Sequence, residues 1–289
     1  MSGRILHVVV FGVLSLVGPR IWAQTPSVSS SPGLQTAIRD VNFENSTVLS
    51  TQEQEEIAQK LQWQDPFWLG RQTPEAMEQL VDQTVLDCYR DHGYWRAKVT
   101  AQVHWVNASE AHRQVDVAIR TISEGRQYVL TELHWSGTQV FREETLAGLM
   151  PLRPHEVLSE GKLRQGLEAI RRLYNANGYL AFTAQPQMEF DDAAAGVALN
   201  IAVQEDTLFS FRSLSVEGFD PATSEQLRRR WENLKEQPYS AEKLRVFLGQ
   251  FFPRSGPDPL EYSTSNIDLN SHTVDVVVSI ETQARKSAR

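Results

Sequence analysis

The sequence predicts an α+β fold: tandem small β-α-α-β-β domains, each a three-stranded sheet covered by two helices. The segments "CYRDHGY" (88–94) and "LYNANGY" (173–179) both read Tyr-x-x-x-Gly-Tyr. The segments "LHWSG" (133–137) and "LSVEG" (214–218) resemble each other in the same way. Stretches of alternating apolar and polar residues follow the predicted helices. Repetition with such a spacing indicates one supersecondary unit that is written several times along the chain.

The middle copy is the clearest. It predicts, in order, a strand at Tyr128–Gly137, a short helix at Arg142–Met150, a longer helix at Ser159–Tyr179, and strands at 180–190 and 197–203. Ser159 is the expected N-cap of the longer helix, because its hydroxyl can accept a hydrogen bond from the first free backbone N–H groups. Asp191-Asp192 is the expected turn between the two last strands.

The first copy shows the same order of elements. Ser50 with Glu53 predicts a capping box at the start of its first helix, and Thr73-Pro74 predicts the start of the second. The strand "WRAKVTAQVHW" (95–105) alternates strictly, which places alternate residues on opposite faces. One face carries Trp95, Ala97, Val99, Ala101, Val103 and Trp105, and the other carries Arg96, Lys98, Thr100, Gln102 and His104.

The third copy begins near Phe209 and departs from the pattern. Ser240 takes the place that the N-cap Ser159 has in the middle copy, and 274–280 predicts the last alternating strand. After Phe252, however, the chain has no Gly-Tyr exit from the helix. We therefore expect a longer connection between helix and strand in this copy.

The Tyr-x-x-x-Gly-Tyr segments are predicted to be architectural. A glycine just after a helix adopts the left-handed conformation of a Schellman motif, in which residues before and after the cap touch. The signature predicted to repeat is Tyr89, Gly93 and Tyr94 in the first copy, Tyr174, Gly178 and Tyr179 in the second, and the turn glycines Gly137 and Gly218.

The N-terminus predicts export. Arg4 precedes an apolar run at 5–17, and Ala23 stands before a suitable cleavage site, so residues 1–23 read as a signal peptide. The predicted division of the remaining chain is a flexible linker at 24–37, domains at 38–125, 126–206 and 207–283, and a basic tail at 284–289.

The composition offers little chemistry. The net charge of −8 and the absence of a basic stripe argue against nucleic acid as a partner. We expect no cofactor, no metal site, no small-molecule substrate and no enzymatic activity, because the seven His are scattered and no hydrolase motif is present. "SEGK" (159–162) resembles a nucleophile motif, but Ser159 is better explained as an N-cap. Cys88 falls within an apolar stripe and is expected to be a small hydrophobic residue.

The repeat, its turn glycines, its Tyr…Gly-Tyr exit and its acidic close (Glu124-Gly125, Glu205-Asp206) resemble POTRA (polypeptide-transport-associated) domains. These are periplasmic repeats of outer-membrane barrel-assembly and translocation proteins. The resemblance implies a periplasmic interaction scaffold whose partners are an outer-membrane barrel protein or unfolded outer-membrane or secreted polypeptides. Family members usually continue into a membrane barrel, which this sequence lacks, so membrane association is expected only through a partner.

The resemblance also implies that the strand after the second helix lies at a sheet edge, where an incoming peptide can add a strand. In the middle copy Pro186 interrupts that strand. The preferred docking edge is therefore in the first copy, with Arg96, Lys98, Thr100, Gln102 and His104 facing outward. Alternatively, Lys98 only protects the edge from aggregation. Two other functions stay open: an envelope or cell-division adaptor, favoured by a retained N-terminal anchor, and a hydrolase, which would need a deep pocket with perturbed ionisable groups.

Overall fold

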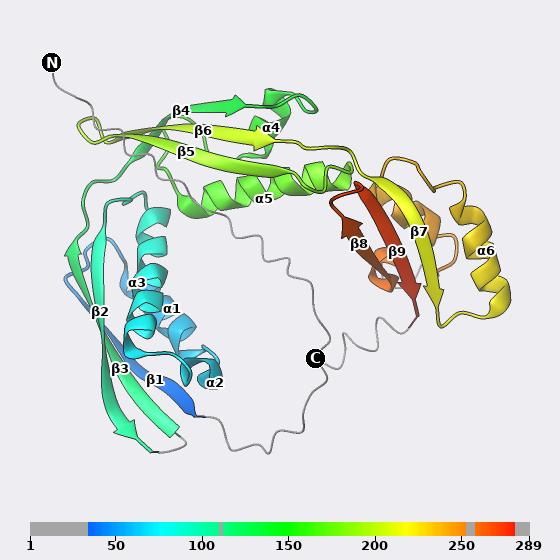
Figure 1. Ribbon diagram of the computed structural model, residues 1–289. Helices are drawn as coiled ribbons and strands as arrows, with labels where there is room; N and C mark the ends of the chain where they lie inside the picture. The colour runs from blue at the N-terminus through cyan, green and yellow to red at the C-terminus, as the bar shows by residue number, and fades with distance from the viewer. Residues whose placement is uncertain (1–33, 110–111, 253–257, 281–289) are drawn as a thin grey trace. The chain divides into compact units, whose positions relative to one another are not determined.

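The computed structural model describes residues 34–109, 112–252 and 258–280, and these form three three-stranded sheets (Figure 1). The strand orders are β1-β3-β2, β4-β6-β5 and β7-β9-β8. The predicted α+β class is thus confirmed. In each sheet the last strand of the copy is central, and the strand after the second long helix lies at an edge. The predicted signal peptide, most of the predicted linker and the predicted basic tail lie outside the described residues.

The first sheet consists of β1 (Gln35–Glu44), β2 (Lys98–Ala108) and β3 (His112–Ser123), with helices α1 (Thr51–Gln62), α2 (Pro66–Leu69) and α3 (Pro74–Asp91). Strand β3 is parallel to β1 and antiparallel to β2. The capping box of Ser50 and Glu53 is confirmed, as is the N-cap Thr73. Strand β1 begins at Gln35, inside the stretch predicted as linker, and the short helix α2 is an addition to the predicted pattern.

The core of this part lies between α1, α3 and the sheet. Val81, Val85 and Tyr89 of α3 are buried at helical spacing, and Val115, Val117 and Ile119 of β3 are buried at alternating positions. Burial of one such side chain contributes roughly 1.5–3 kcal/mol. Buried residues recur at every fourth position of α3 and at every second position of β3. The two elements therefore share one apolar layer, which holds α3 against the sheet.

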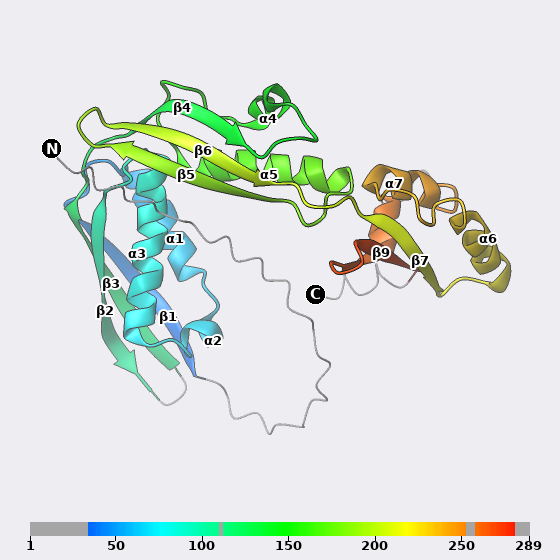
Figure 2. The ribbon, with the colours of Figure 1, turned by 45° about the horizontal axis from the view of Figure 1, so that its top comes forward.

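The middle sheet contains β4 (Val129–Ser136), β5 (Thr183–Asp191) and β6 (Gly196–Gln204), and its helices are α4 (Glu143–Leu149) and α5 (Glu160–Ala176). Helix α5 runs along one face of the sheet (Figure 2). The turn predicted at Asp191-Asp192 joins β5 to β6, where Asp191 accepts hydrogen bonds from the N–H groups of Ala193 and Ala194. Pro186 lies in the edge strand β5, as its missing N–H requires.

The third sheet contains β7 (Ser210–Glu217), β8 (Ser263–Asp268) and β9 (Thr273–Ser279), with α6 (Pro221–Trp231) and α7 (Ala241–Leu248). Ser240 caps α7 by accepting a hydrogen bond from the N–H of Lys243. The long connection expected here includes 253–257, outside the described residues, and a 3-10 turn at Pro259–Tyr262.

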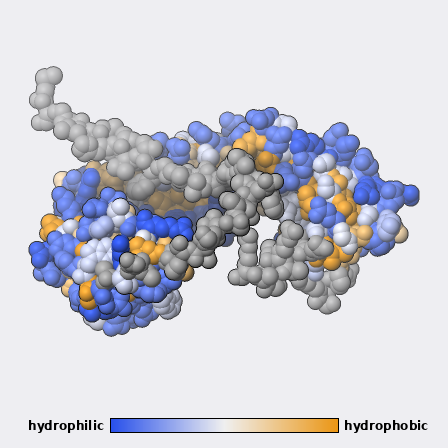
Figure 3. Space-filling view, turned by 60° about the horizontal axis from the view of Figure 1, so that its bottom comes forward, coloured by the Kyte–Doolittle hydropathy of each residue, from blue (hydrophilic) through white to orange (hydrophobic). Residues whose placement is uncertain are grey.

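The contacts divide the chain into two compact units. Among the described residues, the first combines those up to His134 with 151–164 and 187–199, and the second combines 135–150 and 165–186 with those from Asn200 on. Hydrophilic side chains dominate the visible surface, with small hydrophobic patches between them (Figure 3). None of the helices in the described ranges is both long and apolar enough to span a bilayer.

Candidate functional site

The candidate docking edge is strand β2. Among the described residues it pairs with one strand, β3, so its other side is the free edge of the sheet. Lys98, Gln102 and His104 are exposed on it and Thr100 is half-buried. Ala101 is buried on the opposite face, and Val99 and Val103 pack against the core there. These four polar side chains thus share the outward face that their alternation in the sequence indicates.

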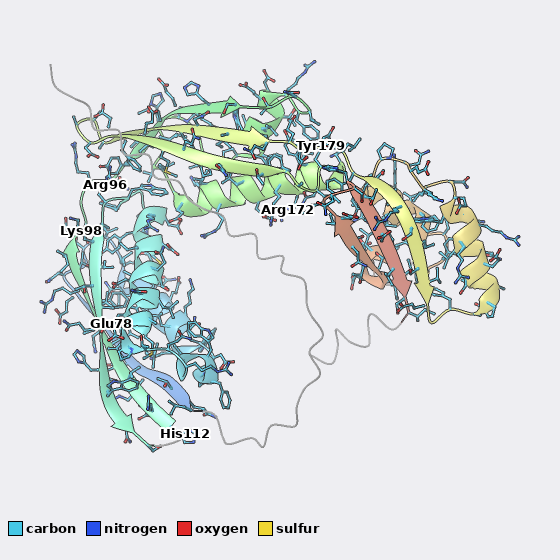
Figure 4. The ribbon with its side chains drawn as sticks, viewed as in Figure 1. Glu78, Arg96, Lys98, His112, Arg172 and Tyr179 are labelled. Atoms are coloured by element: carbon cyan, nitrogen blue, oxygen red, sulfur yellow. The ribbon has the colours of Figure 1, made fainter. Side chains whose placement is uncertain are left out.

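Arg96 lies elsewhere. Strand β2 begins at Lys98, and Arg96 stands in the turn before it. The Arg96 guanidinium lies 4.7 Å from the centre of the Phe190 ring and 3.7 Å from the Asp192 carboxylate. Its side chain therefore contacts the β5–β6 hairpin of the middle copy. Figure 4 labels Arg96 and Lys98.

Two backbone donors of the free edge already have acceptors. The Ala101 N–H donates to Asp82 Oδ1 at 2.6 Å, and the Val103 N–H donates to Glu78 Oε1 at 3.0 Å. In an antiparallel pair, alternate residues bond to the neighbouring strand, so these two N–H groups point to the free side. Both acids come from α3 (Figure 4 labels Glu78). The only signal for this pair in the sequence is its spacing, because acids four residues apart share one helix face.

In the other two sheets, the edge strands β4 and β7 are partly covered by backbone from later in the same copy. At β4, the Leu130 N–H donates to the Glu156 carbonyl and the His155 N–H donates to the Leu130 carbonyl. At β7, residues 236–239 bond to Phe209 and Phe211 in the same way. These contacts occupy backbone groups at the start of each strand, so those ends are not open to a further strand.

The predicted Schellman motifs are confirmed. The Tyr94 N–H donates to the Tyr89 carbonyl at 2.9 Å, and the Tyr179 N–H donates to the Tyr174 carbonyl at 3.1 Å. The rings of each pair meet edge to face, with centres 6.5 Å and 6.0 Å apart. Gly93 and Gly178 have φ of +81° and +91°, a conformation that favours glycine. Gly137 and Gly218 follow β4 and β7, also with positive φ.

Gly93 and Gly178 make a second contact that no pattern in the sequence indicates. The Gly93 carbonyl accepts a hydrogen bond from the Tyr128 N–H at 2.8 Å, and the Gly178 carbonyl accepts one from the Phe209 N–H at 2.9 Å. Tyr128 and Phe209 lie at the start of the next copy. The repeated glycine therefore both ends a helix and joins successive copies.

Each acidic close has a structural role. Glu205 accepts hydrogen bonds from the Tyr174 hydroxyl at 2.7 Å and from the N–H groups of Gln139 and Val140, both at 2.9 Å. Glu124 holds the equivalent loop of the first copy, through Thr47 and Val48, and Tyr89 donates to it at 3.3 Å. Burial raises the pKa of each carboxyl, but these hydrogen bonds outweigh it and the pKa of both is lowered. Burial, with the nearby Glu205, raises the pKa of Tyr174.

These pKa shifts predict acid sensitivity. A carboxyl whose folded-state pKa lies below its ordinary value of 4.5 stabilises the folded chain above that pH. The stabilisation is lost as the pH falls through the lowered folded pKa. We expect wild type to be more stable than the Glu205→Gln variant at pH 7, and the difference to shrink below about pH 4.5. Urea unfolding at pH 7, 4 and 3 measures it, and a difference that is the same at all three values contradicts this role.

The candidate chemical groups have structural partners as well. Ser159 Oγ accepts from the Lys162 N–H at 3.2 Å, which confirms it as the N-cap of α5. Cys88 packs against the first core, and burial raises the pKa of its thiol. Within 34–109, 112–252 and 258–280, no three His, Cys, Asp or Glu side chains gather where they would hold a metal ion.

Part of this chain is similar to a known protein family and to two curated proteins. Residues 128–206 match the POTRA family, described as a surface antigen variable number repeat. The chain is 25% identical over 204 residues to outer membrane protein assembly factor BamA of Neisseria meningitidis serogroup B, a match that covers 64% of this chain and 25% of that protein. It is 22% identical over 202 residues to a putative outer membrane protein assembly factor of Treponema pallidum, covering 68% of this chain and 23% of the relative. The chain thus spans about a quarter of the length of these curated relatives.

A solved structure shares the fold. The crystal structure of POTRA domains 3–5 of Haemophilus influenzae BamA superposes with a TM-score of 0.54 and 20% identity, covering 85% of this chain and 95% of that one. At this level of identity the likeness concerns the arrangement of helices and strands.

Proposed function

We propose, from the premise that residues 128–206 form a POTRA domain, that this chain is a non-enzymatic periplasmic scaffold that assists outer-membrane protein assembly or polypeptide transport. The full-length relatives carry names of outer-membrane assembly factors, which supports this setting. The partners in this proposal are an outer-membrane barrel protein or unfolded outer-membrane or secreted polypeptides.

The observation that carries the proposal is the free edge of β2. An extended segment can add to such an edge through backbone hydrogen bonds, while outward side chains adjust its fit. Lys98, Gln102 and His104 are exposed along this edge, and Thr100 lies among them. In β5, by comparison, Pro186 removes one backbone donor. We therefore propose β2 as the working edge, with Arg96 belonging to the neighbouring contact with Phe190.

In-cell photo-crosslinking tests this function. A photo-reactive residue at Lys98 is expected to capture outer-membrane barrel proteins or their unfolded precursors. Lys60 provides a matched control, since it is also an exposed lysine of the same part but lies on helix α1. Capture of the same polypeptides from Lys60, or of none from Lys98, would contradict docking at β2 and leave Lys98 as a charge that protects the edge.

A further inference from the structure

Glu78 and Asp82 close the free edge of β2 from within the molecule. Their carboxylates occupy the N–H groups of Ala101 and Val103, which are consecutive free-side donors of the strand. An added strand bonds through its own carbonyl oxygens at these positions. It must therefore displace both carboxylates before it can pair along this stretch.

The middle copy carries no acids at the helix positions that correspond to Glu78 and Asp82. When α3 and α5 are aligned on their Tyr-x-x-x-Gly-Tyr exits, Glu78 and Asp82 correspond to Leu163 and Leu167. Leucine offers no acceptor for a backbone donor. The repeat alone therefore does not require acids at these positions.

When an added strand displaces the Glu78 and Asp82 carboxylates from the Val103 and Ala101 N–H groups, both carboxylates lose these hydrogen-bond donors. Both side chains are partly covered by the protein, and burial, with the neighbouring Glu78, raises the pKa of Asp82 against the lowering effect of the Ala101 N–H. A partly buried charge without a hydrogen-bond donor is costly, because it has lost water and gained nothing in return. An incoming strand lowers this cost only if it brings donors of its own, and cationic side chains form the strongest bonds to carboxylates.

The spacing of the acids fits a strand. Residues four apart on a helix lie roughly 5–6 Å apart at Cβ. Alternate residues of a strand share one face and rise by about 6.6 Å. Two cationic side chains at positions i and i+2 of an extended segment can therefore meet both carboxylates together, whereas adjacent cations point to opposite faces.

We propose that Glu78 and Asp82 form an acidic latch that makes the β2 edge selective for extended segments with two Lys or Arg residues at i and i+2. This inference rests on the proposed docking at β2 and adds the chemistry of the partner. The latch keeps the edge donors satisfied in the free protein, and it is exchanged for two ion pairs when such a segment binds. A segment with acidic residues at the same positions is repelled.

Fluorescence anisotropy with three labelled 11-residue peptides tests the selectivity. All alternate Val and Thr; the first has Lys at positions 5 and 7, the second Lys at 5 and 6, and the third Glu at 5 and 7. The first is expected to bind about tenfold more tightly than the second, and still more tightly than the third, as charge-assisted hydrogen bonds allow. In the Glu78→Gln, Asp82→Asn double variant, which keeps shape and acceptors, the three affinities are expected to converge.

Two controls separate this inference from the function beneath it. The Glu55→Gln, Glu56→Gln variant removes the same charge from exposed positions of α1 and is expected to keep the preference of wild type. Amide NMR shows whether bound peptides perturb Val99, Ala101 and Val103. Binding at these amides without charge preference, or a preference that survives in the double variant, would refute the latch alone. Absence of any peptide effect on β2 in wild type would refute docking at this edge and, with it, the latch.

Discussion

Replacing Tyr174 with alanine is expected to lower the free energy of unfolding of the part that contains α5 by about 3–5 kcal/mol. The Tyr174 side chain is fully buried, and its ring stacks on Phe182 with centres 4.0 Å apart and meets Phe141 edge to face at 4.8 Å. Its hydroxyl donates to Glu205 at 2.7 Å. The substitution removes the ring contacts and one of the bonds that hold the loop after β4. Urea unfolding measures the loss in the free energy of unfolding, and hydrogen exchange of the β6 amides measures it within this sheet.

Two further variants separate ring from hydroxyl. Tyr174→Phe keeps the ring and removes only the bond to Glu205, so its expected loss is about 1–3 kcal/mol. Arg172→Ala changes an exposed residue of the same helix and is expected to stay within about 0.5 kcal/mol of wild type. If Tyr174→Phe lost as much as Tyr174→Ala, the ring contacts would carry none of the stability assigned to them.

Replacing Gly178 with alanine is expected to cost about 2–3 kcal/mol and to disturb the start of the third copy. Its φ of +91° is unfavourable for any residue with a Cβ, at roughly 1–2 kcal/mol. The added Cβ would also lie 2.5 Å from the Tyr239 carbonyl oxygen and 2.9 Å from Leu208 Cδ1. Backbone must shift to relieve the first of these contacts. Faster hydrogen exchange at Phe209, whose N–H donates to the Gly178 carbonyl, is the expected signature.

Gly148 provides the control for this substitution. It lies in α4, and a Cβ added there meets no atom within 4 Å. Gly148→Ala is therefore expected to be neutral or to stabilise the helix by up to about 1 kcal/mol. If the two glycine variants had equal stability and Phe209 exchanged unchanged, Gly178 would be a helix terminator only and not a joint between copies.

The sequence determined those elements whose signals lie within a few residues of one another along the chain. Ser50 with Glu53, Thr73, Ser159 and Ser240 marked the helix starts. The Tyr-x-x-x-Gly-Tyr spacing identified both Schellman motifs, because the residues that touch there are only five apart. Alternation in β2 assigned its faces, since a strand turns successive side chains to opposite sides. These interactions are local, so the order of residues along the chain was sufficient to predict them.

Packing decided what joins distant residues. Asp91 accepts hydrogen bonds from the Gly161 N–H and from Ser159 Oγ, 3.3 Å away, and so braces the first copy against the start of α5. Its counterpart in the middle copy is Ala176, which has no such group, yet both positions read alike as ordinary helix residues. In the sequence Arg96 continues the alternation of β2. In the structure the strand begins two residues later, at Lys98, and the Arg96 guanidinium packs over the Phe190 ring.

The same holds for Glu78 and Asp82. In the sequence they stand as ordinary polar residues of a predicted helix. Only the approach of α3 to β2, set by burial of Val81, Val85 and Tyr89 on the same helix, brought their carboxylates within hydrogen-bond distance of Ala101 and Val103. A contact between residues on different elements depends on how those elements pack. The periodicity of either element alone does not determine the distance between the two residues.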